Sequence, residues 1–168
     1  MAVFFNADEV FEIAVNIELN GERFYKASAG LTSEPKVKKL FEFLIMQEQI
    51  HRKTFEDMRK DLPTKFTLPV TFDPAGEAAA YLKALADSHI FNNPEGKKKV
   101  AAGISDLSPA LDFALSFEKD SVLFYDQMKA ITSSELGKNQ IDSIINEEKK
   151  HILLLLDMKR TIRRGGKK

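Results

Sequence analysis

Hydrophobic residues recur along most of the chain at the three- and four-residue spacing of an amphipathic helix, and the two-residue alternation of a half-buried strand is not strong anywhere. The stretch GLTSEP, from Gly30 to Pro35, interrupts the first long helical pattern. Ser108 followed by Pro109 is a typical helix start. The pattern predicts four long helices, at about 7–29, 35–61, 109–131 and 135–163.

The segment between the second and third of these helices differs from the rest. Residues 62–76 contain three prolines and no helical period, and a shorter helix is predicted at about 76–91. Four long helices with one long connection predict an all-α four-helix bundle with a crossover. We therefore expect a single domain over residues 1–168, with hairpin one at 7–61, a crossover at 62–108 and hairpin two at 109–163.

The two predicted hairpins are related by an internal repeat with an offset of 100 residues. The segment QEQIHRKTFEDM, which begins at Gln47, has the same Glu-x-x-His frame and closing Asp-Met as EEKKHILLLLDM, which begins at Glu147. The repeat also pairs Ala14 with Ala114, Glu18 with Glu118, Phe24-Tyr25 with Phe124-Tyr125, Thr32-Ser33 with Thr132-Ser133, and Ile45 with Ile145.

The repeat places four glutamates at the same height. Glu18 and Glu48 each lie 15 residues from Ser33 in the first turn, and Glu118 and Glu148 stand in the same relation to the second turn. At about 1.5 Å per residue, each pair lies roughly 22 Å from its turn, near the middle of its helices. A crossover that runs the length of the bundle then brings the two pairs together.

His51 and His151 complete this set, because a residue three positions after a glutamate lies on the same helix face. Four inward carboxylates would repel one another in a core, and two divalent cations would neutralise them. A single Glu-x-x-His is more often a solvated surface pair, but two copies matched to two repeated glutamates predict a dinuclear metal site. The predicted ligands are Glu18, Glu48, His51, Glu118, Glu148 and His151.

Composition narrows the chemistry. The chain has no cysteine, which excludes disulfides, thiolate zinc sites and cysteine-held iron–sulfur clusters. The formal net charge is zero, so no basic field indicates a nucleic-acid partner. No apolar stretch approaches the roughly 18 residues of a membrane span, and the N-terminus lacks the basic start of a signal peptide. We therefore expect a cytoplasmic protein with no membrane or nucleic-acid partner.

Two tyrosines lie close to the predicted ligands. Tyr25 and Tyr125 each follow a ligand glutamate by seven residues, almost on the same helix face. Three roles remain open for them: hydrogen-bond donors to ligand carboxylates of neighbouring helices, redox-active groups near the metals, or ordinary core residues.

The four glutamates and two Glu-x-x-His frames resemble the ferritin-like di-iron carboxylate superfamily, and within it the rubrerythrins, over about residues 8–61 and 109–162. This resemblance implies two iron ions per chain, although manganese or zinc would accept the same ligands. It also implies that Glu18 and Glu118 are terminal ligands, that Glu48 and Glu148 bridge the ions, and that each histidine binds one ion.

The chain departs from the rubrerythrin pattern at two points. It has no rubredoxin-like domain, so a redox enzyme would need electrons from a separate donor protein. Rubrerythrins also carry an extra glutamate one turn after the third-helix ligand, where this chain has Ser121, matched by Gly21 in the first hairpin. The small residues leave space for dioxygen or peroxide, and Glu22 is a weak candidate for the missing ligand.

The resemblance favours a di-iron oxidoreductase that reduces hydrogen peroxide or dioxygen. A bacterioferritin-like ferroxidase or iron-storage protein is the alternative, although the proline-rich crossover argues against it. A manganese or zinc bundle without redox turnover is a further alternative. The segment Ile152–Leu156 is apolar all round its helix, so the crossover or a second copy must cover it, and we expect a homodimer.

Overall fold

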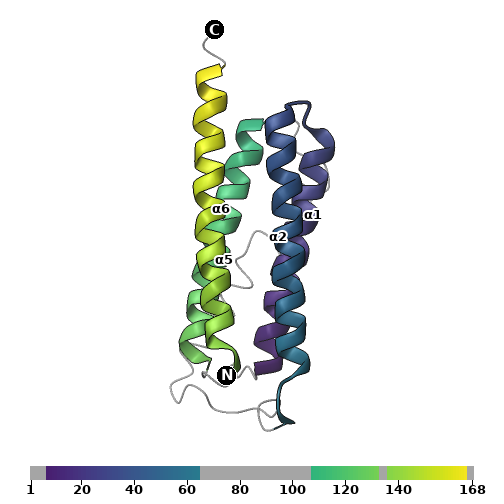
Figure 1. Cartoon of the computed structure of the whole chain (residues 1–168), viewed down its shortest axis with the longest axis vertical. Coiled ribbons are helices and arrows are strands. Elements are labelled where there is room, and N and C mark those ends of the chain that lie inside the picture. Colours follow the sequence, from purple (N-terminus) through teal and green to yellow (C-terminus); the bar gives the residue numbers. More distant parts are fainter. Residues whose placement is uncertain (1–6, 65–106, 133–135, 166–168) are drawn as a thin grey trace, which may run out of the picture.

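The computed structural model describes residues 7–64, 107–132 and 136–165, and all regular secondary structure in these ranges is helical. Two antiparallel helical hairpins lie side by side, and α6 extends beyond the ends of the other helices (Figure 1). This is the predicted all-α bundle of two hairpins. The short helix expected at about 76–91 lies outside the described residues, and the single-domain organisation stays a prediction. The helices are α1 (Ala7–Leu31), α2 (Pro35–Lys60), α5 (Leu107–Ile131) and α6 (Lys138–Gly165).

Local sequence signals account for some of the helix ends but not for all of them. Pro35 occupies the first turn of α2, where its missing N–H costs no hydrogen bond, and the Glu34 side chain accepts a bond from Lys36 N. Gly30 does not end α1, which continues to Leu31. The predicted start of the fourth helix at Glu135 is also wrong, because α6 begins at Lys138. Gly137 precedes it with φ at +90°, a left-handed conformation that interrupts the helix.

Within hairpin one, salt bridges tie the start of α1 to the end of α2. The Arg59 guanidinium donates to both carboxylate oxygens of Asp8, at 2.6 and 2.9 Å, and to Glu12 at 3.1 Å. The two helices of each hairpin contact each other far more extensively than the hairpins contact one another. The interface between the two hairpins is therefore filled mainly by side chains, and the types of these side chains determine whether the bundle can bind a ligand there.

Two apolar clusters fill opposite ends of that interface. In α1, one cluster ends at Ile17 and the other begins at Phe24, while in α6 they are separated between Ile145 and Leu155. Glu18, Glu148 and His151 fall in these gaps, at the middle of the bundle. Hydrophobic burial on both sides thus holds the helices together around a polar centre. The first cluster includes Phe11, Ile17, Phe55, Phe124 and Ile145, and the second includes Phe24, Phe41, Leu44, Leu111 and Leu155.

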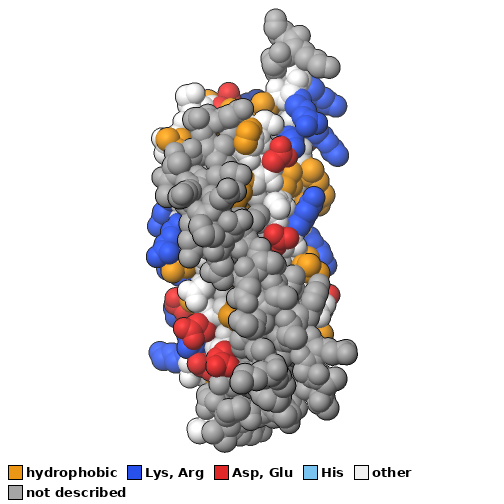
Figure 2. Space-filling model, turned by 180° about the vertical axis from the view of Figure 1, so that it is seen from behind, with side chains coloured by type: hydrophobic (Ala, Val, Ile, Leu, Met, Phe, Trp, Pro, Cys, Tyr) orange, Lys and Arg blue, Asp and Glu red, His pale blue; other side chains and the backbone are white. Residues whose placement is uncertain are grey.

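The outer surface is polar and mixed in charge. Figure 2 shows acidic and basic side chains interspersed with scattered hydrophobic ones on the described part of the face seen from behind. Larger apolar side chains are exposed on α2 and α6, including Met46, Ile50, Leu153 and Leu154. Among the described residues, none of the helices is long and apolar enough to cross a membrane.

Candidate metal centre

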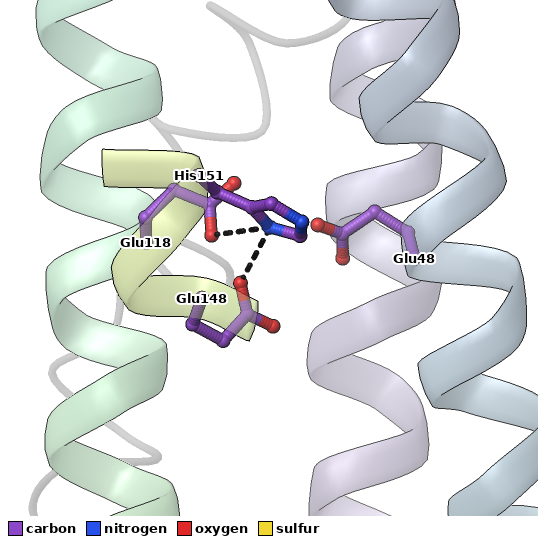
Figure 3. A group of neighbouring side chains, drawn as sticks. All are labelled: Glu48, Glu118, Glu148 and His151. Carbon is purple, nitrogen blue, oxygen red and sulfur yellow. Dashed lines mark hydrogen bonds and ion pairs between the residues drawn. The ribbon is translucent and has the colours of Figure 1, made fainter. Parts of the chain in front are cut away.

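The structure brings all six predicted ligand side chains into the centre of the bundle. Each helix contributes through a residue that faces the interface between the hairpins, and none of the six is more than 2% exposed. Four of them point toward one another across that interface: Glu48 from α2, Glu118 from α5, and Glu148 and His151 from α6 (Figure 3). Glu18 from α1 and His51 from α2 complete the cluster.

The donor atoms form two groups that meet at one carboxylate. Glu48, Glu118, Glu148 and His151 can each offer one atom so that all four lie within 4.8 Å of one another. Glu18, His51 and Glu148 form a second group by the same measure. Each group contains residues from both hairpins and has the size of a single metal position. Glu148 belongs to both groups, whereas Glu48 belongs to only one.

The histidines face the cluster through the same ring atom. His51 Nδ1 lies 3.0 Å from Glu148 Oε1 and 3.6 Å from Glu18 Oε2. His151 Nδ1 lies 2.9 Å from Glu148 Oε2 and 3.5 Å from Glu118 Oε2. The two rings stack with centroids 5.6 Å apart. Glu148 therefore lies between two imidazoles, and each Nδ1 points to a different group.

Both tyrosines donate hydrogen bonds across the interface. Tyr25 of α1 donates its hydroxyl to Glu118 Oε1, and Tyr125 of α5 donates to Glu18 Oε1. This is the first of the three roles left open by the sequence. Both phenols are fully buried, and burial together with the nearby glutamates raises the pKa of Tyr25 and of Tyr125 well above the ordinary value. The phenols therefore stay protonated and can act as donors.

Burial and mutual repulsion disfavour the charged form of two of the four carboxylates. Burial and repulsion from Glu18, Glu148 and Glu118 raise the pKa of Glu48 well above its ordinary value. Burial and the charge of Glu148 do the same to the pKa of Glu118. Burial opposes ionisation of Glu148 too, but hydrogen bonds with Glu118, His151 and His51 lower the pKa of this central carboxylate.

The pKa values of both histidines are raised, although burial by itself would lower them. Burial alone would lower the pKa of His51, but the charge of Glu18 and the contacts with Glu148 raise it to about 12. In the same way, burial is outweighed by Glu118 and Glu148, and the pKa of His151 rises to about 9. A protonated imidazole cannot bind a cation. A metal ion would therefore compete with protons for these nitrogens, and metal affinity should rise with pH.

The fit to a metal can be judged from the polar atoms that find no partner. Buried polar groups in folded proteins are nearly always hydrogen-bonded, and exceptions often mark a bound ion. Among the described residues, most of the exceptions are at the cluster, and these are oxygen and imidazole donors that iron, manganese and zinc accept. The atoms without a hydrogen bond are Glu18 Oε2, Glu48 Oε1 and Oε2, Glu118 Oε2, and His51 Nδ1, whose contact with Glu148 is an ion pair, together with Arg52 Nε and Ser121 Oγ.

Glu22 is held away from this cluster. Its Oε1 accepts hydrogen bonds from Lys26 and, at 2.8 Å, from Gln49, and its Oε2 accepts one from Arg52 at 2.9 Å. Burial would raise the pKa of Glu22, but these partners lower it overall. Since both oxygens are engaged by neighbouring side chains, Glu22 does not replace the missing glutamate of the rubrerythrin pattern.

Two features of the site differ from the prediction or were missed by it. Gly21 was expected to leave space for dioxygen or peroxide, but Glu48 uses the space beside it, because a Cβ there would lie 2.4 Å from Glu48 Oε2. Glu147 contacts His51 from the opposite hairpin, with 2.8 Å between its Oε2 and His51 Nε2. Glu147 precedes a ligand by one residue, a spacing that places it off the ligand face of its own helix. Only the repeat mate at that position, Gln47, could have drawn attention to it.

An all-α bundle of two hairpins with four glutamates and two histidines at its centre defines the ferritin-like diiron-carboxylate class. The chain matches the family model for rubrerythrin over residues 9–159, and it belongs to that family. It is also similar to a solved structure from Thermotoga maritima, described as a candidate ferritin-like diiron-carboxylate protein, with 25% identity and a TM-score of 0.67. That similarity covers 94% of this chain and 96% of the other. No curated protein sequence gave a match.

Proposed function

We propose that the chain holds two iron ions and reduces hydrogen peroxide with electrons from a separate donor protein. The observation that carries the proposal is the pair of donor groups that share Glu148, because each has the size of a metal position. The rubrerythrin family match supports iron over manganese or zinc. The assignment of the six side chains as ligands is part of the proposal.

The chain's own residues would prepare the site for this chemistry. Four carboxylates offset the charge of two divalent ions, and Tyr25 and Tyr125 fix two of the carboxylates by hydrogen bonds from the other hairpin. The apolar clusters above and below exclude bulk water, which strengthens electrostatic interactions in the site.

Two ferrous ions, when bound, supply the two electrons that reduce one hydrogen peroxide molecule, with two protons, to two molecules of water. The same two electrons would reduce dioxygen only to hydrogen peroxide, so reduction of dioxygen to water would need two turnovers, whereas peroxide needs one. These 168 residues contain no cysteine and cannot form a rubredoxin-like centre, so we propose that a separate donor protein restores the electrons.

The test begins with metal content. Protein purified without added metal, and protein reconstituted anaerobically with Fe(II) and desalted, would be analysed for iron per chain. We expect about two irons per chain after reconstitution, and consumption of one peroxide per two ferrous ions. A variant with Glu148 and His151 replaced by alanine should lose both properties. Retention of zinc or manganese in preference to iron would contradict the redox function, and uptake of iron far beyond two per chain would favour storage.

The proposed homodimer can be examined in the same preparations. Leu153 is 65% exposed and Leu154 is 43% exposed, although they belong to the apolar run that we expect to be covered. Both side chains lie on α6, which contacts α2, and α2 carries the exposed Met46 and Ile50. Analytical ultracentrifugation should find a dimer, and Leu153→Lys should weaken it. A monomer at all concentrations would contradict the proposal.

A further inference from the structure

The imidazole of His51 contacts carboxylates on both sides of its ring. Its Nδ1 faces Glu148 and Glu18 inside the cluster, at 3.0 and 3.6 Å. Its Nε2 lies 2.8 Å from Oε2 of Glu147, which stands on α6 of the other hairpin. His51 is only 1% exposed, while the Glu147 side chain is 38% exposed. The ring therefore connects the buried cluster to a carboxylate at its edge.

The two repeats differ at this position. Glu147 is matched, 100 residues earlier, by the neutral amide Gln47, and both residues are half-buried on their helices. The two polar contacts described for His151 are made by its Nδ1, with Glu148 and Glu118. The two histidines thus share their inward contacts, but a carboxylate stands at the repeat position that serves His51 and an amide at the one that corresponds to His151.

We propose that Glu147 is a positioning residue that makes the two metal positions unequal, with the tighter one at His51. This inference rests on the proposed two-ion site. A carboxylate that accepts the Nε2–H of an imidazole fixes the tautomer with a free Nδ1, holds the ring in one orientation and makes Nδ1 a stronger donor. Glu147 supplies this interaction from one hairpin to a ligand of the other.

An ordinary ion pair at the protein surface would not have this effect. Exposed pairs contribute little because solvent screens both charges. Here one partner is buried and directs its other nitrogen into the donor group that contains Glu18 and Glu148. Changing such an outer partner typically lowers metal affinity by about 10–100-fold. The consequence would be sequential filling, in which the position at His51 takes up its ion first.

Three variants separate the charge of Glu147 from its hydrogen bond. Glu147→Gln keeps an acceptor and removes the charge, Glu147→Ala removes both, and Asp157→Asn removes an exposed charge from the same helix as a matched control. Co(II) binding to the metal-free full chain would be followed by calorimetry and by the visible absorption of the bound ion. We expect Glu147→Ala to weaken the tighter binding step by about 10–100-fold, Glu147→Gln to weaken it less, and Asp157→Asn to leave both steps unchanged.

A second readout is insensitive to a general loss of stability. Nitrogen-15 spectra of the histidines in the Zn(II)-loaded chain should show His51 with its proton on Nε2, and this signal should shift in Glu147→Ala while that of His151 stays. The reciprocal variant Gln47→Glu should strengthen the weaker binding step and bring the two constants closer together.

The outcomes distinguish this inference from the proposed function. If the wild-type chain binds no metal, the proposed function and this inference both fail. If it binds two ions and Glu147→Ala leaves both constants and the His51 spectrum unchanged, only the inference fails. An equal fall in both constants, or a fall in the weaker step alone, would also overturn it, because neither result fits selective support of His51.

Discussion

The two hairpins present the same three ligands but surround them differently. One turn after Glu18, the first hairpin has Glu22, which is buried and accepts a hydrogen bond from the half-buried Arg52. At the matching positions, the second hairpin has Val122 and Ile152, which pack against the two apolar clusters. The ligand positions are restricted by the geometry of the centre, whereas residues one turn away only have to suit their local surroundings. A repeated frame of ligands therefore does not imply a symmetric site.

The largest expected effect separates the two central carboxylates. Glu148 contacts both imidazoles and belongs to both donor groups, whereas Glu48 belongs to one. Glu148→Ala should weaken binding of both ions by more than about 100-fold, beyond the loss caused by changing an outer partner. Glu48→Ala should leave one ion bound. Metal analysis after desalting would measure both, and equal losses in the two variants would show that the carboxylates have equivalent roles.

The next comparison is between the small residues that follow Glu18 and Glu118. In Gly21→Ala the new Cβ would lie 2.4 Å from Glu48 Oε2 and 2.7 Å from Phe117 Cζ. We expect a loss of about 1–3 kcal/mol in unfolding free energy from overpacking, despite the better helix propensity of alanine. Ser121→Ala removes a buried hydroxyl without a described partner and should change stability by less than about 1 kcal/mol. Urea unfolding of the metal-free proteins would measure both, and a more stable Gly21→Ala would contradict this account.

The two tyrosines should contribute equally to stability, although the hairpins around them differ. Tyr25 and Tyr125 make the same bond to a glutamate of the opposite hairpin. Tyr25→Phe and Tyr125→Phe should each lower the unfolding free energy by about 1 kcal/mol, and the two losses should agree within about 0.5 kcal/mol. Thermal unfolding followed by circular dichroism is sufficient for this test. A clear difference between the variants would show that the asymmetry reaches the hydrogen bonds of the ligands themselves.

The smallest effect is expected from replacing the Glu22–Arg52 pair of the first hairpin by the apolar residues at the matching positions of the second. The double variant Glu22→Val with Arg52→Ile copies the second hairpin and should change stability by less than about 1 kcal/mol, because replacing a paired charge by packed apolar groups is often nearly neutral. Glu22→Val alone should be less stable than the double variant, since it leaves Arg52 without its partner. Metal content should stay at the wild-type level in both, and a loss of metal in the double variant would show that this network supports the centre.

Much of the centre follows from the sequence because helix geometry is regular. Equal distances of Glu18 and Glu48 from Ser33 fixed their common height, and the 100-residue offset did the same for Glu118 and Glu148. The same argument placed both tyrosines near the ligand face of their own helices, and it left open whether they bond to ligands of other helices. These relations depend on rise and rotation per residue, which vary little between helices.

Most of the features that the sequence did not predict are contacts between helices, which depend on the relative rotation and packing of the helices. The contact between Glu147 and His51 joins residues 96 apart on helices of different hairpins, and spacing along one helix cannot predict it. The partners of Glu22 were unpredictable for the same reason. The late start of α6 follows from the left-handed conformation of Gly137, which a glycine permits but does not require.

The division of both donor groups between the hairpins has a consequence for how the protein folds. Glu148 of the second hairpin is needed beside Glu18 and His51 of the first, so neither hairpin alone holds a complete group. Metal capture must then follow the docking of two segments that are distant in the chain, which is the slow, long-range part of folding. Bound ions would stabilise only the docked state, in proportion to their concentration over their dissociation constants. The supply of the proposed ions would thus set the fraction of chains in the docked state, and the metal-free chain would be the form most exposed to proteases.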